Sequence, residues 1–223
     1  MTLDSSGNLL VGTTSAVQFN TSTVTGWNVN NAGQSAQAAS SSTVAYFNRL
    51  TDDGTIVSLR QAGVEEGTIS VSGSTVSYNG GHLSRWSQLI DNSKDTSIVK
   101  GTVMTNLDDM CEWAGEDNEQ LNKMAVSSVE GDTNVAGVFV NWDEDDPDYD
   151  DMNVAMTGDM VIRIAQGNTV ARGDLLMSAG DGTAKPQDDD IVRAKTIAKV
   201  TSTHVSHTYS DGSYLVPCVL MAC

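Results

Sequence analysis

The sequence has 223 residues, of which 39% are hydrophobic and only 5% aromatic, and its formal net charge is −17. Such a chain is a poor partner for nucleic acid or an anionic membrane surface, because both attract proteins through Lys and Arg. Five acidic and two basic residues precede Gly80, whereas twenty-four acidic and ten basic residues follow it. We therefore expect no nucleic-acid partner and a distinct acidic C-terminal part.

The three cysteines, Cys111, Cys218 and Cys223, are widely spaced, without a Cys-x-x-Cys pair or a histidine at ligand spacing. This pattern argues against a zinc site and a disulfide framework. Cys218 lies in an apolar run and is expected in the core. The start lacks the pattern of a signal peptide, and no run reaches the ~18 apolar residues of a membrane span. We expect synthesis in a cytoplasm and no membrane insertion.

Residues 1–42 are predicted to be an N-terminal attachment strand followed by a linker. Residues 3–12 are typical of a turn and a short strand, because Gly7-Asn8 supplies the positive φ of a tight turn. Residues 20–42 are dominated by small and polar side chains, with Trp27 as the only large anchor. This composition indicates a linker or a weakly ordered stalk.

Residues 43–80 are predicted to form a slender β stem. Short apolar segments bounded by glycine recur about every ten residues, at 44–47, 55–60, 67–71 and 74–78. One chain has too little apolar surface here for a sandwich, given the cost of ordering its backbone. Three intertwined chains would bury the alternating Ile, Val and Leu side chains along a common axis, so we expect a homotrimer.

Residues 81–223 are predicted to form a compact β-barrel or β-clip with one helical insertion, which makes the fold mainly β. The helix is expected within 107–124, where apolar residues at helical spacing share a face despite Gly115. Turns are expected at 157–159 and at Asp181-Gly182. The expected strands are 135–140, 153–156, 160–164, 174–177, 191–194, 196–200 and 214–221.

The segment 53–79 resembles the distal stem of phage tail fibres and tailspikes. It contains Asp-Gly-Thr-Ile-Val-Ser-Leu-Arg at 53–60, Gly-Thr-Ile-Ser-Val-Ser-Gly at 67–73 and Val-Ser-Tyr-Asn at 76–79. Residues 3–15 are similar to the phrase that opens many such modules. In this family the stem commonly runs into a C-terminal intramolecular chaperone domain.

The C-terminal part resembles the autoproteolytic chaperone domain of phage appendage proteins, the peptidase G2 type. The similar residues are Cys-Glu-Trp-Ala-Gly-Glu-Asp at 111–117, Val-Phe-Val at 138–140, Gly-Asp-Leu-Leu at 173–176 and Ile-Ala-Lys-Val at 197–200. This resemblance implies a homotrimer whose end domain nucleates assembly and, in some members, cuts itself off afterwards.

Self-cleavage would place the scissile bond near the junction between stem and end domain, at 79–86. His82 is the candidate base, Ser84 the nucleophile and Glu112 the acid. The alternative is structural, since Asn-Gly-Gly at 79–81 is a strong turn signal and Trp86 would anchor the core of the end domain.

The acidic run at 143–151 offers oxygen ligands of the kind that calcium prefers, at Asp143, Asp145, Asp148 and Asp150. The run lacks the glycine and the closing glutamate of an EF-hand, and a solvated loop is the alternative. We expect no other cofactor.

These observations predict a structural virion protein of a tailed phage, a homotrimeric tail fibre or tailspike component assembled in the host cytoplasm. Its expected partners are two further copies and other phage tail or virion proteins. A receptor-binding adhesin, with Trp27, Tyr46 or Tyr78 stacking on host glycans, and a self-cleaving chaperone are the alternatives. No Ser-His-Asp motif, metal-ligand cluster or nucleotide loop supports an enzyme acting on a free substrate.

Overall fold

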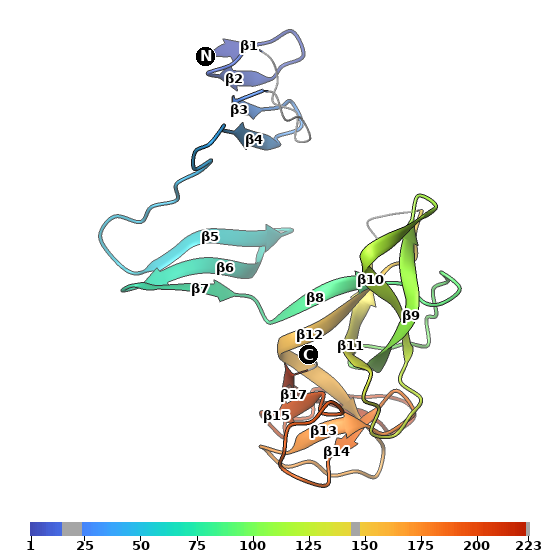
Figure 1. The fold of residues 1–223 in the computed structure, drawn as a ribbon. Coiled ribbons are helices and arrows are strands. Elements are labelled where there is room, and N and C mark those ends of the chain that lie inside the picture. Colours follow the sequence, from blue (N-terminus) through green and yellow to red (C-terminus); the bar gives the residue numbers. More distant parts are fainter. Residues whose placement is uncertain (15–23, 144–147, 222–223) are drawn as a thin grey trace. The chain divides into compact units, whose positions relative to one another are not determined.

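The computed structural model describes residues 1–14, 24–143 and 148–221, and all regular structure in these ranges is β (Figure 1). This confirms the mainly β fold. The chain divides into two compact units, Met1–Asn79 and Gly80–Cys223. No helix in the described ranges has the length and apolar character needed to cross a bilayer.

The first sheet of the N-terminal unit consists of two hairpins with the same kind of turn. Asp4 Oδ1 accepts hydrogen bonds from the backbone N–H groups two and four residues ahead, each at 2.9 Å. Asn30 Oδ1 accepts the equivalent bonds at 3.1 and 2.8 Å. The antiparallel order is β1 (Thr2–Leu3), β2 (Leu9–Val11), β3 (Gly26–Val29) and β4 (Ser35–Ala38). The segment interpreted as a linker therefore contains β3 and β4, because these side chains organise the turns between short strands.

The second sheet of the N-terminal unit has three antiparallel strands, β5 (Gly54–Gln61), β6 (Val64–Ser72) and β7 (Thr75–Asn79). Ala62 and Gly63 join β5 to β6 with φ values of 48° and 85°, as a two-residue hairpin turn requires. The three strands expected at 55–60, 67–71 and 74–78 are confirmed. The strand expected at 44–47 is wrong, because the described segment 43–53 contains none.

The C-terminal unit is built around a five-stranded β-barrel. Its strands follow the order β12 (Met152–Ile164), β14 (Ala184–Pro186), β13 (Leu175–Ser178), β15 (Ala198–Val200) and β17 (Tyr214–Met221). Pairing of β17 with β12 closes the ring, from Thr157 opposite Met221 to Ile164 opposite Tyr214. Closure gives every strand of the ring a neighbour on both sides, so no barrel strand is itself a free edge.

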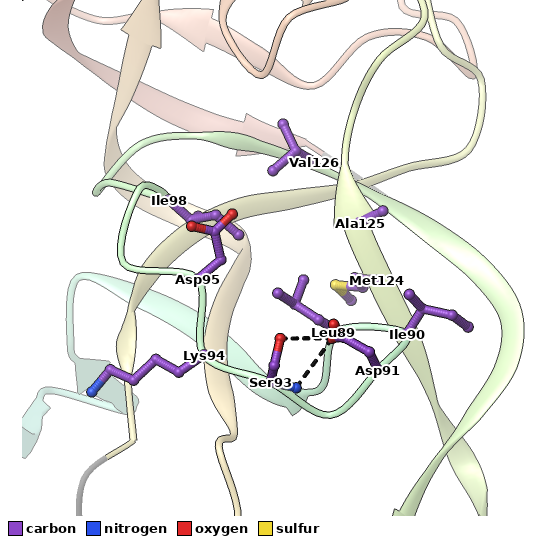
Figure 2. Close-up of a pocket in the computed structure, with 10 residues that line it drawn as sticks. All are labelled: Leu89, Ile90, Asp91, Ser93, Lys94, Asp95, Ile98, Met124, Ala125 and Val126. Carbon is purple, nitrogen blue, oxygen red and sulfur yellow. Dashed lines mark hydrogen bonds between the residues drawn. The ribbon is translucent and has the colours of Figure 1, made fainter.

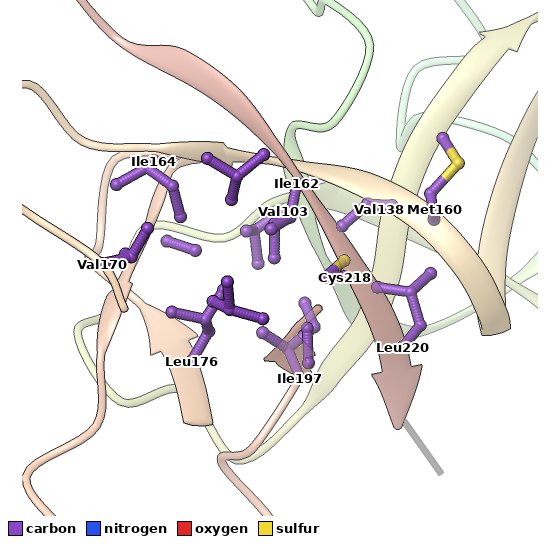
Figure 3. Close-up of a cluster of buried hydrophobic side chains, with 14 of the residues drawn as sticks. Val103, Val138, Met160, Ile162, Ile164, Val170, Leu176, Ile197, Cys218 and Leu220 are labelled. Carbon is purple, nitrogen blue, oxygen red and sulfur yellow. The ribbon is translucent and has the colours of Figure 1, made fainter. Parts of the chain in front are cut away.

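Aliphatic side chains fill the barrel (Figure 3). Ile162, Leu176 and Ile197 are fully buried there, and Cys218 is 1% exposed. This confirms the expectation that Cys218 is a core residue. Full burial of each such aliphatic side chain contributes about 1.5–3 kcal/mol to folding.

The sheet continues beyond the barrel through β11 (Val135–Trp142), β9 (Val103–Trp113) and β10 (Glu116–Val126), with β8 (His82–Ser87) on β12 and β16 (His207–Thr208) on β17. The first half of β12 lies between β8 and β11. A second core, which includes Met104, Met124 and Phe139, packs under this extension. The long strand β12 thus connects the two cores.

The helix expected within 107–124 is wrong, because these residues form the β9–β10 hairpin. Ala114 and Gly115 make its two-residue turn with φ values of 56° and 79°. Register shifts on either side of Asn122 break the two-residue alternation of the strands. The apolar residues therefore fall at three- and four-residue spacings that imitate a helix.

The turn expected at 157–159 is also wrong, because β12 continues through it. Gly158 has a φ of 100°, and a Cβ there would lie 2.7 Å from the carbonyl oxygen of Gly81. Glycine at position 158 permits the close approach of the segment that enters β8, and the chain does not reverse its direction there.

The strand expected at 191–194 is wrong, because these residues form a loop. In this loop Asp189 Oδ1 accepts a hydrogen bond from the Ile191 N–H.

Candidate functional site

An open hollow of about 450 Å³ lies beside the chain that follows β8 (Figure 2). Leu89, Ile98 and Met124 supply apolar lining, while Asp91 and Asp95 supply carboxylates. Each carboxylate accepts a hydrogen bond from a serine two residues further on: Asp91 Oδ1 accepts one from the Ser93 hydroxyl, and Asp95 Oδ1 accepts one from the Ser97 hydroxyl. These hydrogen bonds hold the pKa of both carboxyls below the usual range. The hollow therefore combines an apolar floor with carboxylates whose hydrogen bonds are satisfied within their own turns.

The structure does not bring the three predicted self-cleavage residues together. His82 and Ser84 lie on β8, opposite Gly158 and Ala155 of β12. The Ser84 Oγ is buried and has no hydrogen-bond partner in the described part of the chain. Burial, followed by the positive charge of Lys100, lowers the pKa of His82, which favours the neutral form that a base requires. No hydrogen bond described for these ranges links that base to the serine.

Glu112 is hydrogen-bonded to Gln88, and Gln88 lies four residues beyond Ser84 along the chain. Gln88 Oε1 accepts the Glu112 N–H at 2.8 Å, and Gln88 Nε2 donates to the Glu112 carbonyl at 3.0 Å. Four residues of extended chain span roughly 13 Å. The geometry therefore offers no support for self-cleavage at 79–86, which stays a prediction. Trp86 is 53% exposed, so the expectation that it anchors the core is wrong.

A buried polar cluster centred on Gln88 links β9 to the start of β12. Besides its two bonds to Glu112, Gln88 Nε2 donates to Asp151 Oδ1 at 2.9 Å. Trp113 Nε1 donates to the other oxygen of the same carboxylate at 2.8 Å. Gln88 is 1% exposed and Asp151 6%. Because buried polar groups are costly unless paired, this cluster specifies how the hairpin docks.

We predict that Gln88→Ala lowers the free energy of unfolding by about 3 kcal/mol, since it leaves buried backbone groups of Glu112 and one oxygen of Asp151 without partners. Urea denaturation followed by tryptophan fluorescence measures the change. Gln120→Ala, at an exposed position of β10, is the matched control and should shift the free energy by less than about 0.5 kcal/mol. Equal effects of the two variants would contradict the role of the cluster.

The described residues of the acidic run at 143–151 do not form a metal site. Asp143 is partly buried, Asp148 and Asp150 are exposed, and Asp145 lies outside the described residues. Within the ranges that the structure covers, no three His, Cys, Asp or Glu side chains are grouped closely enough to hold a metal ion. Calcium binding stays a prediction.

The two described cysteines are buried and free; Cys223 lies outside the described residues. Burial raises the pKa of Cys218 from 9.0 to about 12 and also raises the pKa of Cys111. A thiol is nucleophilic only as the thiolate. Neither side chain is therefore suited to act as a nucleophile at neutral pH.

In a Cys223→Ser background, we predict that a disulfide reagent labels the native chain at pH 8 at least about 100-fold more slowly than the urea-unfolded chain. Absorbance of the released thiolate gives both rates.

Burial of Cys218 also predicts how stability depends on pH. Its folded pKa lies above the unfolded value, so the contribution of the protonated thiol to stability is full below pH 9.0 and is lost towards pH 12. The urea midpoint should fall over this range. Rapid labelling of a native thiol would contradict the burial.

The β5–β7 sheet has one apolar face, formed by Val57, Leu59, Ile69, Val71, Val76 and Tyr78. The register places them together, since Val57 and Tyr78 both lie opposite Ile69, and Val76 lies opposite Val71. No residue of the three strands is buried. Leu59 is 57% and Tyr78 78% exposed. Within the described part of the N-terminal unit, this apolar face is therefore largely exposed.

The opposite face of the same sheet is polar and satisfied within the sheet. Asn79 Nδ2 donates to Thr68 Oγ1 and to Ser70 Oγ, at 2.9 and 2.8 Å. The other members of this face include Ser58, Ser72, Thr75 and Ser77. Alternation of polar and apolar residues is typical of an antiparallel sheet that has one face in water and the other face packed on a core.

Comparison with protein-family models, with curated protein sequences and with solved structures finds no match.

Proposed function

We propose that the chain is a structural virion protein of a tailed phage, a homotrimeric tail fibre or tailspike component whose C-terminal unit promotes trimer assembly. The apolar face of the β5–β7 sheet carries this proposal. A three-stranded sheet needs a covered hydrophobic face to be stable. Burying its six side chains against other copies supplies that cover, at about 1.5–3 kcal/mol for each large side chain.

The number of copies follows from how such faces can meet. Two sheets packed face to face make a sandwich, whereas three sheets can enclose a triangular stem with every apolar face turned inward. The resemblance of residues 53–79 to phage fibre stems favours three. The preceding segment has the same need for partners, because Tyr46 is 82% and Leu50 85% exposed. Neighbouring copies would cover these side chains too.

Light scattering of the purified chain tests this proposal directly. The expected molar mass is three times the 23.6 kDa of one chain. A mass of two chains would favour the sandwich, and a single-chain mass would overturn the proposal. Immunogold labelling of phage particles with an antibody against the chain then tests the virion location, with the tail as the expected position.

A receptor-binding adhesin at the fibre tip is the second candidate, because Trp27, Tyr46 and Tyr78 are 37%, 82% and 78% exposed. Exposed aromatic rings can stack on host glycans. Nitration with tetranitromethane separates the two uses of Tyr78. The trimeric stem should protect this ring, whereas a glycan-binding surface would leave it reactive.

A further inference from the structure

A partly buried arginine lines a second hollow in the C-terminal unit. Arg85 lies on β8, and the hollow beside it has a volume of about 460 Å³. The side chains that line it include Arg85, Asn106 and Asn122 on the polar side and Val135, Ala136 and Met156 on the apolar side. The site therefore combines a single cationic group with apolar walls.

Most of the hydrogen-bonding capacity of Arg85 is unused. A guanidinium has five N–H donors. Nη2 donates one hydrogen bond to Asn106 Oδ1 at 2.6 Å. Nε is buried and finds no acceptor among the described residues. The two Nη1 hydrogens and the second Nη2 hydrogen make no hydrogen bond to the described residues, so they are available to a ligand.

No carboxylate in the described ranges compensates the charge of Arg85. Four other arginines, Arg49, Arg60, Arg163 and Arg193, each form an ion pair with Asp or Glu. Desolvation lowers the pKa of the Arg85 guanidinium; the nearby Cys111 thiol opposes that shift, whereas no Asp or Glu side chain contributes to it. The chain has 29 acidic and 12 basic residues, so an unpaired arginine at a partly buried position is unexpected. A charge held out of water without a partner is costly unless something else binds it.

Asparagine side chains hold the guanidinium in place. Asn106 Oδ1 accepts from both Arg85 Nη2 and Asn122 Nδ2, the latter at 3.0 Å. Asn106 Nδ2 donates to the carbonyl of Asn134 at 3.1 Å, which turns its oxygen towards the arginine. A cation fixed before the ligand arrives loses less entropy on binding.

We propose that the hollow at Arg85 binds a carboxylate attached to a short apolar group. The planar fork of a guanidinium matches the two oxygens of a carboxylate. A single cation in a chain of net charge −17 suits a monoanion better than a phosphate or a polyanion. Val135, Ala136 and Met156 would pack against the apolar group and keep water away from the ion pair.

Two sources provide this chemistry: a free small carboxylate, or the Asp or Glu side chain of another copy of the chain. The first source needs no oligomer, so the site can be tested whether or not the chain is trimeric. Butyrate is the probe, and butyramide at the same ionic strength is the neutral control.

The test uses the unaltered chain and the modification of its arginines by phenylglyoxal, read at each residue by peptide mass mapping. Butyrate should slow the modification of Arg85 at least fivefold, with half-saturation at roughly millimolar concentration. The exposed Arg172 should be unaffected, and butyramide should have no effect. If the carboxylate comes from another copy, Arg85 should be protected without butyrate and become reactive on dilution to single chains.

Variants give an independent reading. Arg85→Gln should abolish the butyrate-induced rise in melting temperature, and Arg85→Lys should weaken it, whereas Arg172→Gln should retain it. If the source is another copy, Arg85→Gln should lower the molar mass and Arg172→Gln should not. Arg85 that reacts at the same rate with butyrate, with butyramide and on dilution would overturn the proposal, and this result needs no variant to fold.

Discussion

Replacing Gly137 with alanine is expected to prevent the C-terminal unit from folding. Gly137 lies in β11 with a φ of 140°, and a Cβ there would lie 2.0 Å from the carbonyl oxygen of Ala155. Backbone atoms of the paired strand β12 cannot move away without breaking the sheet. We expect a loss of about 4 kcal/mol or more, a large part of the roughly 5–15 kcal/mol by which a typical domain is stable.

The position matters because Gly137 lies where β11 changes the core that it faces. Ala136 and Phe139 pack in the second core, whereas Val135 and Val138 pack in the barrel core. Strict alternation would put Ala136 and Val138 on the same side. The register shift between Val135 and Gly137 reverses this alternation. Glycine permits that bulge, as at other sites where two backbones approach closely.

Thermal unfolding followed by near-ultraviolet circular dichroism measures the effect, together with the yield of folded chain. Gly167→Ala is the matched control, since Gly167 also has a positive φ, of 83°, but a Cβ there would meet nothing within 4 Å. It should cost only the ~1–2 kcal/mol of a left-handed backbone. Similar losses in both variants would show that the contact with β12 is not the cause.

If the proposed trimer forms through the stem, replacing Leu59, Val76 and Tyr78 together with threonine is expected to convert it into single chains. The three side chains are more than half exposed in one chain and contribute apolar area only when copies associate. Their loss removes about 1.5–3 kcal/mol for each side chain in each copy. Light scattering should report a fall from three times 23.6 kDa to 23.6 kDa.

A triple change on the other face of the same sheet provides the control. Thr55, Thr75 and Ser77 lie on the polar face of β5 and β7, and replacing them with alanine should leave the molar mass unchanged. Retained tryptophan circular dichroism would show that the C-terminal unit is still folded in both variants. If the apolar-face variant kept both its mass and its resistance to protease, the stem would not be the interface.

The β5–β7 sheet was predictable because its signals are local. Glycine at each corner and alternating apolar residues define three short strands and their turns without reference to the rest of the chain. The β9–β10 hairpin could not be predicted in this way, since its bulges break the two-residue alternation by which a strand is identified. Only the Ala114-Gly115 turn was a usable signal, and the apolar spacing around it favoured the wrong element.

The polar sites depend on contacts that no local pattern reveals. Gln88 meets Asp151, which lies 63 residues further along the chain, and Arg85 meets Asn106, 21 residues away. Neither Gln88 nor Arg85 belongs to a recognisable motif. The residues that did suggest chemistry, His82, Ser84 and Glu112, carry no shared hydrogen bond in the described structure. His82 and Ser84 lie within β8, whereas Glu112 lies on β9 beside Gln88, past the end of β8.

The sequence by itself determined that the chain is mainly β, that its acidic residues concentrate after Gly80, and that residues 54–79 have an apolar side with too little chain of their own to cover it. These are properties of composition and of two-residue periodicity, which can be read along one strand. Tertiary structure alone decided the closure of the barrel, the switch of β11 between two cores and the placing of Arg85 beside Asn106 with no carboxylate partner among the described residues. Each of these depends on which distant strands become neighbours, and that is set by the packing of the whole unit.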